Sequence, residues 1–256
     1  MNQALDLIVL LEDAIWLGFL VFLRTAAIVS LLPAFGEQTI PMRIKLVIAL
    51  AFTVIVAPAL DLELPPFTID QIAVLSLTET LSGALIGLGL RLFILALQTA
   101  GTIAAQSTSL SQILGGAAVE PLAAIGYILT ISAIALAVMT GLHVKSAELM
   151  ILSYSFLPLG LFADGADVAM WGTAQISKAF SLAFVLAAPF VLISVLYNLT
   201  LGVINRAMPQ LMVAFVGAPV ITLGGLFVLF LAAPSMLTVW LEALDRFIAA
   251  PFEVTQ

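Results

Sequence analysis

Long apolar runs separated by short polar connections make up most of this chain. A membrane-spanning helix needs about 20 mostly apolar residues, and the pattern predicts helices of this kind along the whole sequence. The runs cover residues 14–35, 44–60, 72–97, 122–142, 179–204 and 211–241, and a shorter run at 149–162 is ambiguous. We therefore expect an all-α, polytopic membrane protein.

Prolines interrupt these runs at many points, and each removes a backbone donor and usually ends or kinks a helix. The last run is the clearest case, because its length of about 31 residues includes Pro219 and Pro234. One simple span needs fewer residues. We expect kinked helices and helical hairpins, and for the last run a kinked pair of half-helices.

The composition supports a membrane protein and indicates no second domain. Hydrophobic residues make up 63% of the 256 positions and charged residues only 9%, whereas soluble domains carry roughly 25% charged residues. No linker, charge run or low-complexity tract divides the chain. We expect a single membrane domain over residues 1–256.

Charged side chains occur inside the apolar runs at Arg24, Glu79 and Arg91. Each costs about 2.5–3.5 kcal/mol at the centre of a membrane helix, so we expect these groups to face protein or water instead of lipid. Gly83 and Gly87 are four residues apart, a spacing that lets helix backbones approach closely. We interpret the glycines as helix-packing positions.

The inventory of reactive groups argues against an enzyme. The chain has no cysteine and one histidine, His143, and its formal net charge is −7. The zinc, Ser-His-Asp, phosphate-loop and GxSxG patterns are absent, and the acidic balance offers no basic patch to nucleic acid. We expect no catalysis, no cofactor, no metal ion and no nucleic-acid partner.

Residues 106–121 form a stretch of a different kind. Gln106 begins a small, polar, uncharged segment that continues to Gly115 and Gly116 between two apolar runs. Non-helical backbone at membrane depth survives only inside protein or beside water. The stretch is therefore either an ordinary loop outside the bilayer or a plug that enters a cavity, and the residues alone do not separate these alternatives.

Two motifs carry a resemblance to a known family. The first is Leu23-Arg24 followed by Pro33-Ala-Phe-Gly-Glu37-Gln-Thr-Ile-Pro41-Met-Arg43-Ile-Lys45. The second is Asn198-Leu-Thr-Leu-Gly202-Val-Ile-Asn205-Arg206-Ala-Met-Pro209-Gln210, and Ala100-Gly101 and Gln106 lie between the two motifs. Over nearly its whole length the chain resembles the FliR family, the R subunits of the flagellar type III protein-export gate.

This resemblance implies an architecture and a set of partners. The fold would be a P-like helical unit followed by a Q-like hairpin, and the chain would be a non-catalytic subunit present singly in the gate. Its partners would be the P and Q subunits, the B subunit and the export-gate A subunit, with unfolded flagellar proteins as cargo. The gate would lie in the bacterial inner (cytoplasmic) membrane at the flagellar basal body, in contact with membrane lipid.

The resemblance also implies site residues. By position, the family's channel plug corresponds to Gln106, Ser107, Thr108, Ser109, Leu110, Gly115, Gly116, Glu120 and Pro121. Subunit contact or assembly is expected of Arg24, Glu37, Pro41, Arg43, Lys45, Asn198, Asn205, Arg206, Pro209 and Gln210. The family often has more glycine and aromatic residues just after the position of Gln106, so the plug assignment rests on position and not on a motif.

Three alternatives remain open at this point. A paralogous subunit of a virulence-type injectisome would share the architecture. A small-solute secondary transporter is favoured by Arg24, Glu79 and Arg91 within apolar runs, but the chain has no detectable internal repeat. A membrane enzyme would need a cluster of catalytic groups that one histidine and scattered carboxylates do not supply.

Overall fold

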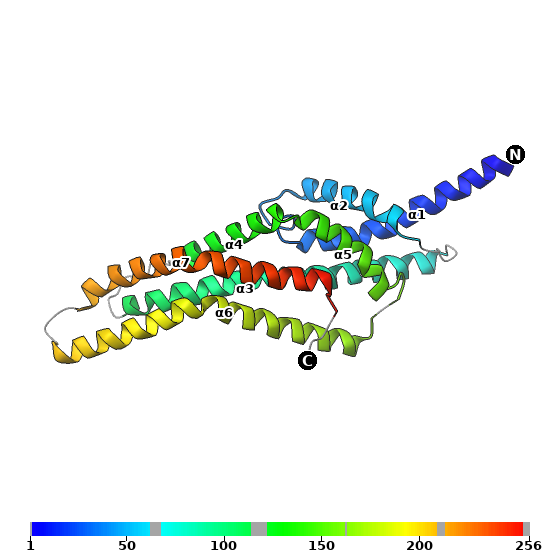
Figure 1. The fold of residues 1–256 in the computed structure, drawn as a ribbon. Coiled ribbons are helices and arrows are strands. Elements are labelled where there is room, and N and C mark those ends of the chain that lie inside the picture. Colours follow the sequence, from blue (N-terminus) through cyan, green and yellow to red (C-terminus); the bar gives the residue numbers. More distant parts are fainter. Residues whose placement is uncertain (1, 62–67, 114–121, 162, 209–212, 253–256) are drawn as a thin grey trace. The chain divides into compact units, whose positions relative to one another are not determined.

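The computed structural model describes residues 2–61, 68–113, 122–161, 163–208 and 213–252, and this part of the chain is helical with no strand. Figure 1 shows the elements in order. They are α1 (Asn2–Leu31), α2 (Met42–Val56), the short 3-10 helix η1 (Ala57–Ala59), α3 (Ile69–Ile113), α4 (Leu122–Met139), α5 (Leu142–Phe156), α6 (Gly165–Ala207) and α7 (Val213–Ala249). The expected all-α fold is confirmed.

Five stretches within these helices are long and apolar enough to cross a membrane. They are Ala14–Leu31, Met42–Ala59, Asp70–Ser107, Gly165–Ala207 and Val220–Ala249, and the bent pair α4 and α5 adds a sixth if it counts as one span. The bend falls at Gly141, whose positive φ of 86° is a conformation that glycine adopts without steric cost. The polytopic membrane class is confirmed for the described residues.

The chain divides into two compact units, and both are built from segments far apart in the sequence. Unit 1 contains residues 1–91, 138–174 and 245–256, and unit 2 contains residues 92–137 and 175–244. The helices α3, α4, α6 and α7 each contribute to both units. The expectation of a single domain over residues 1–256 stays a prediction.

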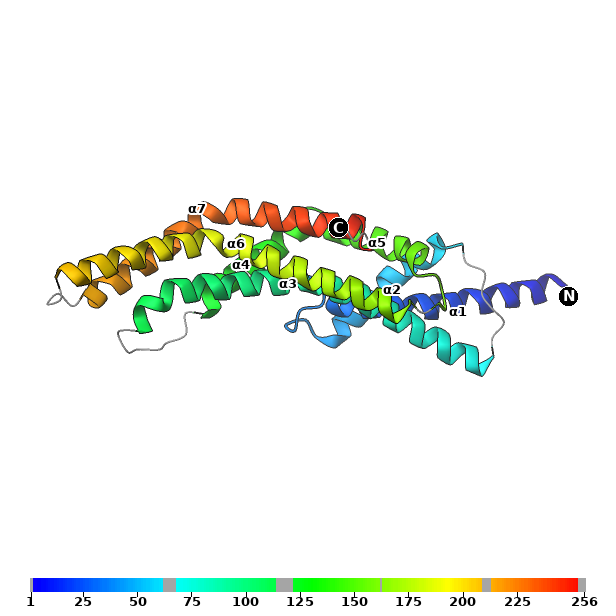
Figure 2. The same cartoon turned by 90° about the horizontal axis from the view of Figure 1, so that it is seen from below.

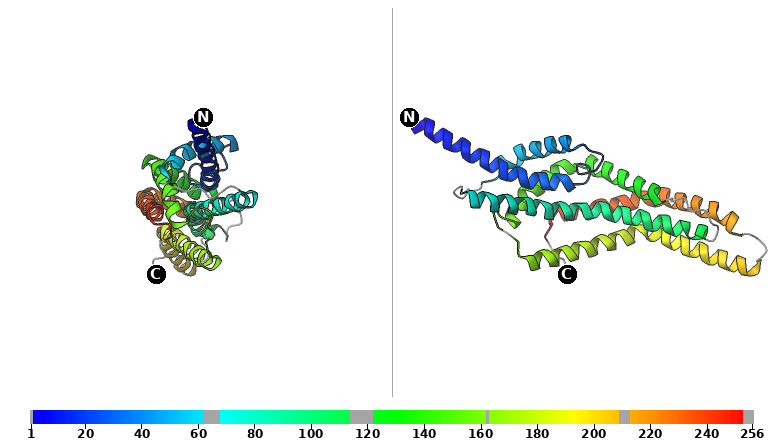
Figure 3. Two further views of the ribbon diagram at one scale, coloured as in Figure 1. Left: turned by 90° about the vertical axis from the view of Figure 1, so that its right-hand side faces the viewer. Right: turned by 180° about the vertical axis from the view of Figure 1, so that it is seen from behind.

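In unit 1, α2 lies along α1, as the rear view in Figure 3 shows. The buried positions of α2 recur at helical spacing and form one stripe, namely Ala49, Phe52, Thr53 and Val56. Thr53 Oγ1 lies 2.8 Å from Thr25 Oγ1 of α1, so the one hydroxyl in this stripe is hydrogen bonded across the contact. The stripe therefore buries its polar atom with a partner, as an apolar environment requires.

In unit 2, α3 crosses α4 at two glycines. A Cβ atom on Gly101 would lie 2.1 Å from Gly126 Cα, closer than any real contact. The parts of α6 and α7 in this unit form an antiparallel hairpin (Figure 2). Trp240 of α7 is fully buried and donates from Nε1 to the Phe93 carbonyl at 2.9 Å. These contacts hold the hairpin against α3.

The structure corrects two expectations about helix breaks. The last apolar run is not a pair of half-helices, because α7 continues without interruption from Val213 to Ala249. Proline is tolerated in membrane helices where neighbouring groups satisfy the freed carbonyl. The helix α3 also continues to Ile113, well beyond the expected end near Leu97. Its hydroxyls bond back to the helix, as Ser107 Oγ does to the Ala104 carbonyl at 2.8 Å.

Candidate functional site

A buried ion pair joins α1 and α3 in unit 1. The side chains of Arg24 and Glu79 are both 0% exposed. Arg24 donates from Nε to Glu79 Oε2 at 2.8 Å and from Nη2 to Glu79 Oε1 at 2.9 Å. Two parallel hydrogen bonds make this a bidentate pair, the strongest arginine–carboxylate geometry. The expectation that both charges face protein is confirmed.

The same guanidinium holds the C-terminal end of α5. It donates to Ser153 Oγ at 3.2 Å and to the Leu157 carbonyl at 2.9 Å. Its Cζ atom lies 3.7 Å from the centre of the Tyr154 ring, a distance typical of a cation–π contact. The last carbonyls of a helix lack intrahelical donors, so Arg24 both neutralises Glu79 and caps α5.

Glu79 in turn holds the turn that follows α5. Its Oε1 atom accepts a hydrogen bond from Gly160 N at 3.4 Å. Gly160 has a φ of 75°, and a Cβ atom there would lie 2.6 Å from Leu75 Cδ2. Glycine fits both the backbone conformation and the space. The ion pair thus connects α1, α3, α5 and the turn after α5.

Two glycines let the helices come close enough for this pair. A Cβ atom on Gly83 would lie 2.4 Å from the Arg24 carbonyl oxygen, and one on Gly87 would lie 3.0 Å from the Leu31 side chain. Both glycines are on α3 and both neighbours are on α1. The interpretation of Gly83 and Gly87 as helix-packing positions is confirmed.

A second set of contacts fixes the turn between α1 and α2. Lys45 Nζ donates to the Gly36 carbonyl at 2.8 Å. Arg91 of α3 pairs with Glu37 at 2.7 Å, and both of these side chains are about one-fifth exposed. Ala34 adopts a positive φ of 71°, a conformation that costs a non-glycine residue roughly 1–2 kcal/mol. The turn is therefore held in a strained shape by two cationic side chains.

These contacts account for several residues expected at a subunit interface. Glu37 and Lys45 bind within their own chain, whereas Pro41 and Arg43 are exposed. Arg24 offers no surface to another subunit, because its own chain encloses it completely. The structure therefore does not support a direct contact between Arg24 and a partner subunit. Any effect of Arg24 on assembly would act through the folding of unit 1.

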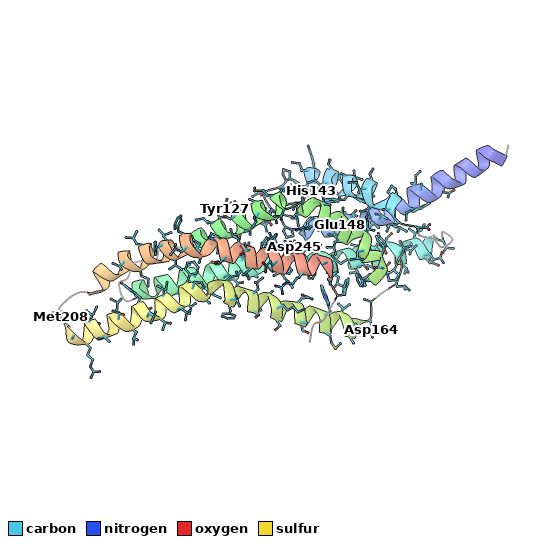
Figure 4. All side chains as sticks on the ribbon, viewed as in Figure 1. Tyr127, His143, Glu148, Asp164, Met208 and Asp245 are labelled. Carbon is cyan, nitrogen blue, oxygen red and sulfur yellow. The ribbon has the colours of Figure 1, made fainter. Side chains whose placement is uncertain are left out.

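The second motif lies on α6, in unit 2. Asn198 Nδ2 donates to Ser194 Oγ at 3.1 Å, and Ser194 Oγ donates to the Ser107 carbonyl of α3. Asn205 and Arg206, in the last turn of α6, are exposed. Figure 4 marks this end of the helix by the neighbouring residue Met208. Pro209 and Gln210 lie outside the described residues.

The expected plug stretch is only partly described. Gln106 is exposed, Ser107 is buried, and the backbone of 108–113 continues α3. The expectation of non-helical backbone is therefore wrong for residues 106–113, which include Thr108, Ser109 and Leu110. The other expected plug residues, Gly115, Gly116, Glu120 and Pro121, lie outside the described residues, and the role of the stretch stays a prediction.

Sequence reasoning missed the contacts that the C-terminal segment makes in unit 1. Lys145 Nζ binds both carboxylate oxygens of Asp245, which lies 100 positions further along the chain, at 2.7 and 2.8 Å. Trp171 Nε1 donates to the Pro251 carbonyl at 2.8 Å. A buried indole N–H needs an acceptor, so the sequence indicates that Trp171 makes a hydrogen bond if it is buried, but it does not identify the acceptor.

In the part of the chain that the structure describes, the remaining reactive groups do not gather into a reaction centre. His143 and Glu148 are exposed on α5, and Figure 4 shows both on that helix. Within the described ranges, no three histidine, aspartate or glutamate side chains come together as a metal site. The intramembrane charges that favoured a transporter pair with each other or with the α1–α2 turn.

These features define a class, a membrane-embedded all-α protein with a fully buried ion pair inside its helical packing. The family described as "Bacterial export proteins, family 1" matches residues 15–247. The chain belongs to this family of bacterial export proteins.

Curated relatives extend the comparison over most of the chain. The flagellar biosynthetic protein FliR of Caulobacter vibrioides is 32% identical over 232 residues, which cover 89% of this chain and 92% of the relative. The proteins of the same name from Escherichia coli and Bacillus subtilis are 28% and 26% identical, covering 80% and 78% of this chain and 80% and 79% of their own lengths. The resemblance inferred from the two motifs is confirmed.

Proposed function

We propose that this chain is a non-catalytic subunit of the flagellar type III protein-export gate. In this proposal it assembles with P and Q subunits in the inner membrane at the flagellar basal body. The assembly forms the channel for unfolded flagellar proteins and closes it at rest. The family match and the names of the relatives support the flagellar export role.

The observation that carries the assembly is the excess length of apolar helix. The helix α6 has 43 residues. Its most apolar 18 residues have a mean hydropathy of 2.5, and only 28% of them are buried inside the chain. At a rise of about 1.5 Å per residue, α6 is about 64 Å long. This length is roughly twice the thickness of the hydrocarbon core of a bilayer, which is about 30 Å. An ordinary tilt of about 20° does not absorb this difference.

The apolar surface outside the hydrocarbon core therefore needs a protein cover. Exposed apolar residues occur along α6 from Met170 to Val203, which are 66% and 64% exposed, and these two positions are about 50 Å apart along the helix. A lone chain would hold part of this surface in water, at a cost of about 25 cal/mol per Å². Other membrane helices that pack along α6 would remove that cost.

The polar groups at the end of α6 suit a contact between subunits. Asn205 and Arg206 are exposed beside apolar neighbours, and Leu199 and Val203 precede them on the same helix. Side-chain amides and guanidinium groups in membrane proteins bond across helices. We assign Asn205 and Arg206, together with Pro209 and Gln210 beyond the described residues, to a subunit contact.

The closing element of this proposal is the segment from Gln106 to Pro121. It follows the part of α3 that Ser194 and Gly126 hold in unit 2. Its glycines would let backbone fill a narrow pore and leave it again. The positional likeness to the family's plug supports this role.

A purification experiment tests the assembly. The tagged chain is extracted from its own membrane in mild detergent, and the P and Q subunits recovered with it are quantified. Replacing Arg206 with Leu should reduce their recovery several-fold. The matched control is Thr200→Val on the same helix. The Thr200 hydroxyl donates to the Leu196 carbonyl of its own helix at 2.8 Å, so its removal should not affect a partner subunit. Full recovery with Arg206→Leu would contradict the assigned contact, and a wild-type chain that brings down neither subunit would contradict the gate.

A further inference from the structure

The helix α2 differs from α3 and α6 because its apolar length matches a bilayer. With η1 it covers Met42–Ala59, 18 residues with a mean hydropathy of 1.9. Rises of about 1.5 Å per α-helical residue and 2.0 Å per 3-10 residue give a length of about 28 Å. The hydrocarbon core of a bilayer is about 30 Å thick. This segment needs no cover beyond lipid along its length.

The outward face of α2 offers lipid nothing polar. No charged residue occurs between Lys45 and Asp61. The hydroxyl of Thr53 is turned inward, where it is 7% exposed and bonded to Thr25 and to the Ala49 carbonyl. Only 22% of the span is buried inside the chain. The large exposed side chains of the helix are apolar, and include Ile44, Leu46, Val47, Leu50, Val54 and Ile55.

This face also lacks the features that the chain uses where its helices pack on one another. The closest of those contacts, where helix backbones nearly touch, rest on glycine, as at Gly83 and Gly87 in unit 1 and at Gly101 in unit 2. Helix interfaces in membranes are enriched in small residues that bring backbones together. The outward face of α2 instead presents branched side chains such as Val47 and Val54, which are 65% and 73% exposed.

Charges stand at both ends of this apolar length. Arg43 is exposed in the first turn of α2, and Asp61 is exposed just beyond η1. Lys45 Nζ donates to the Gly36 carbonyl of its own chain at 2.8 Å. Arg43 is therefore the basic residue of this helical turn whose side chain is exposed at the surface. A long basic side chain at the end of an apolar span reaches the headgroup level, where anionic lipids attract it.

We propose that the outward face of α2 is a lipid-binding surface, with acyl chains along Val47, Leu50 and Val54 and an anionic phospholipid headgroup at Arg43. The proposal rests on membrane embedding and not on the export-gate function. One basic side chain near the membrane is worth about a fivefold local preference for anionic lipid. The α6 surface, by contrast, is too long for lipid alone.

The absence of native cysteine makes the test direct. Val47→Cys and Val54→Cys are each labelled with an environment-sensitive fluorophore in the full-length chain, within the assembly purified from its membrane. The assembly is reconstituted in phosphatidylcholine vesicles that contain phospholipid brominated on the acyl chains. Ala49→Cys is the control on the same helix, because Ala49 is 2% exposed and faces the protein.

We expect brominated chains to quench both outward labels strongly and the Ala49 label weakly. Brominated phosphatidylglycerol at a low mole fraction should quench the Val47 label several-fold more than brominated phosphatidylcholine at the same fraction. Arg43→Gln should remove that preference and leave quenching by phosphatidylcholine unchanged.

Several results would overturn the proposal. Equal quenching by the two brominated lipids with Arg43 intact refutes the headgroup site. Outward labels that escape quenching refute the contact with acyl chains. The same cysteines left unlabelled then cross-link to another subunit if protein covers α2, or react with an aqueous maleimide if water does. The first two outcomes leave the gate proposal untouched, because recovery of the P and Q subunits is measured separately.

Discussion

The buried pair of Arg24 and Glu79 allows a quantitative test of how unit 1 is held together. Replacing Glu79 with Leu leaves a guanidinium whose side chain is 0% exposed without a counter-charge. Removing one partner of a buried pair costs about 3–5 kcal/mol. Arg24→Met should cost a similar amount, because it leaves the carboxylate without a counter-charge and also withdraws the donor from the Leu157 carbonyl.

Removing both charges at once should cost less than the sum of the two single removals. Arg24→Met combined with Glu79→Leu fills similar volume and leaves no buried charge, and such replacements are often close to neutral. The Leu157 carbonyl and the Gly160 N–H still lose their partners, at about 1–3 kcal/mol for each group left unsatisfied. A double variant that loses clearly less stability than the two single losses added together is the expected signature.

Thermal unfolding in detergent, followed by Trp fluorescence, measures these effects. For a chain of this size about 2–4 °C of melting temperature corresponds to 1 kcal/mol, so each single variant should melt roughly 6–20 °C lower. The control pair is Lys145 and Asp245, whose side chains are 30% and 38% exposed. Breaking it should cost only about 0.2–1 kcal/mol. Single Arg24 or Glu79 variants that melt with the control variants, or additive losses in the double variant, would refute the reasoning.

Three further predictions follow from the geometry. Gly101→Leu should prevent unit 2 from packing and lower the yield of folded chain, because even a Cβ atom would lie 2.1 Å from Gly126; protease resistance measures this, and a fully resistant variant would contradict the close crossing. Ala34→Gly should raise the melting temperature by a few degrees, because it relieves a positive φ of 71° at a gain of up to about 1 kcal/mol; an unchanged or lower value counts against the strain. Deleting residues 108–117 should let ions or small dyes leak through membranes that also contain the P and Q subunits, and a tight membrane around an intact deleted assembly would end the plug role.

Local signals predicted the helical part of the fold well. Apolar runs located the cores of the helices, since roughly 20 apolar residues in sequence have few other stable states. The cost of charge in lipid correctly placed Arg24, Glu79 and Arg91 against protein. Spacing identified Gly83 and Gly87 as packing positions, because small residues four apart lie on one helix face.

Long-range pairing could not be predicted in the same way. Arg24 and Glu79 are 55 positions apart, and Lys145 and Asp245 are 100 apart, so no periodicity within one helix relates them. Our interpretation of the sequence also overestimated how strongly proline and short polar stretches end a helix. The helix α7 continues through its prolines and α3 continues to Ile113. Membrane helices tolerate proline where neighbouring groups satisfy the freed carbonyl, and hydroxyls such as that of Ser107 bond back to their own helix.

The mass of the intact assembly tests the central claim most directly. The tagged chain, purified from its own membrane in mild detergent, is measured by native mass spectrometry after release of the detergent. The proposed gate function predicts a complex that holds one copy of this chain together with several P and Q subunits, whose helices would cover the exposed apolar surface of α6. A stable monomer that carries only lipid, or an assembly made of this chain alone, would contradict the account.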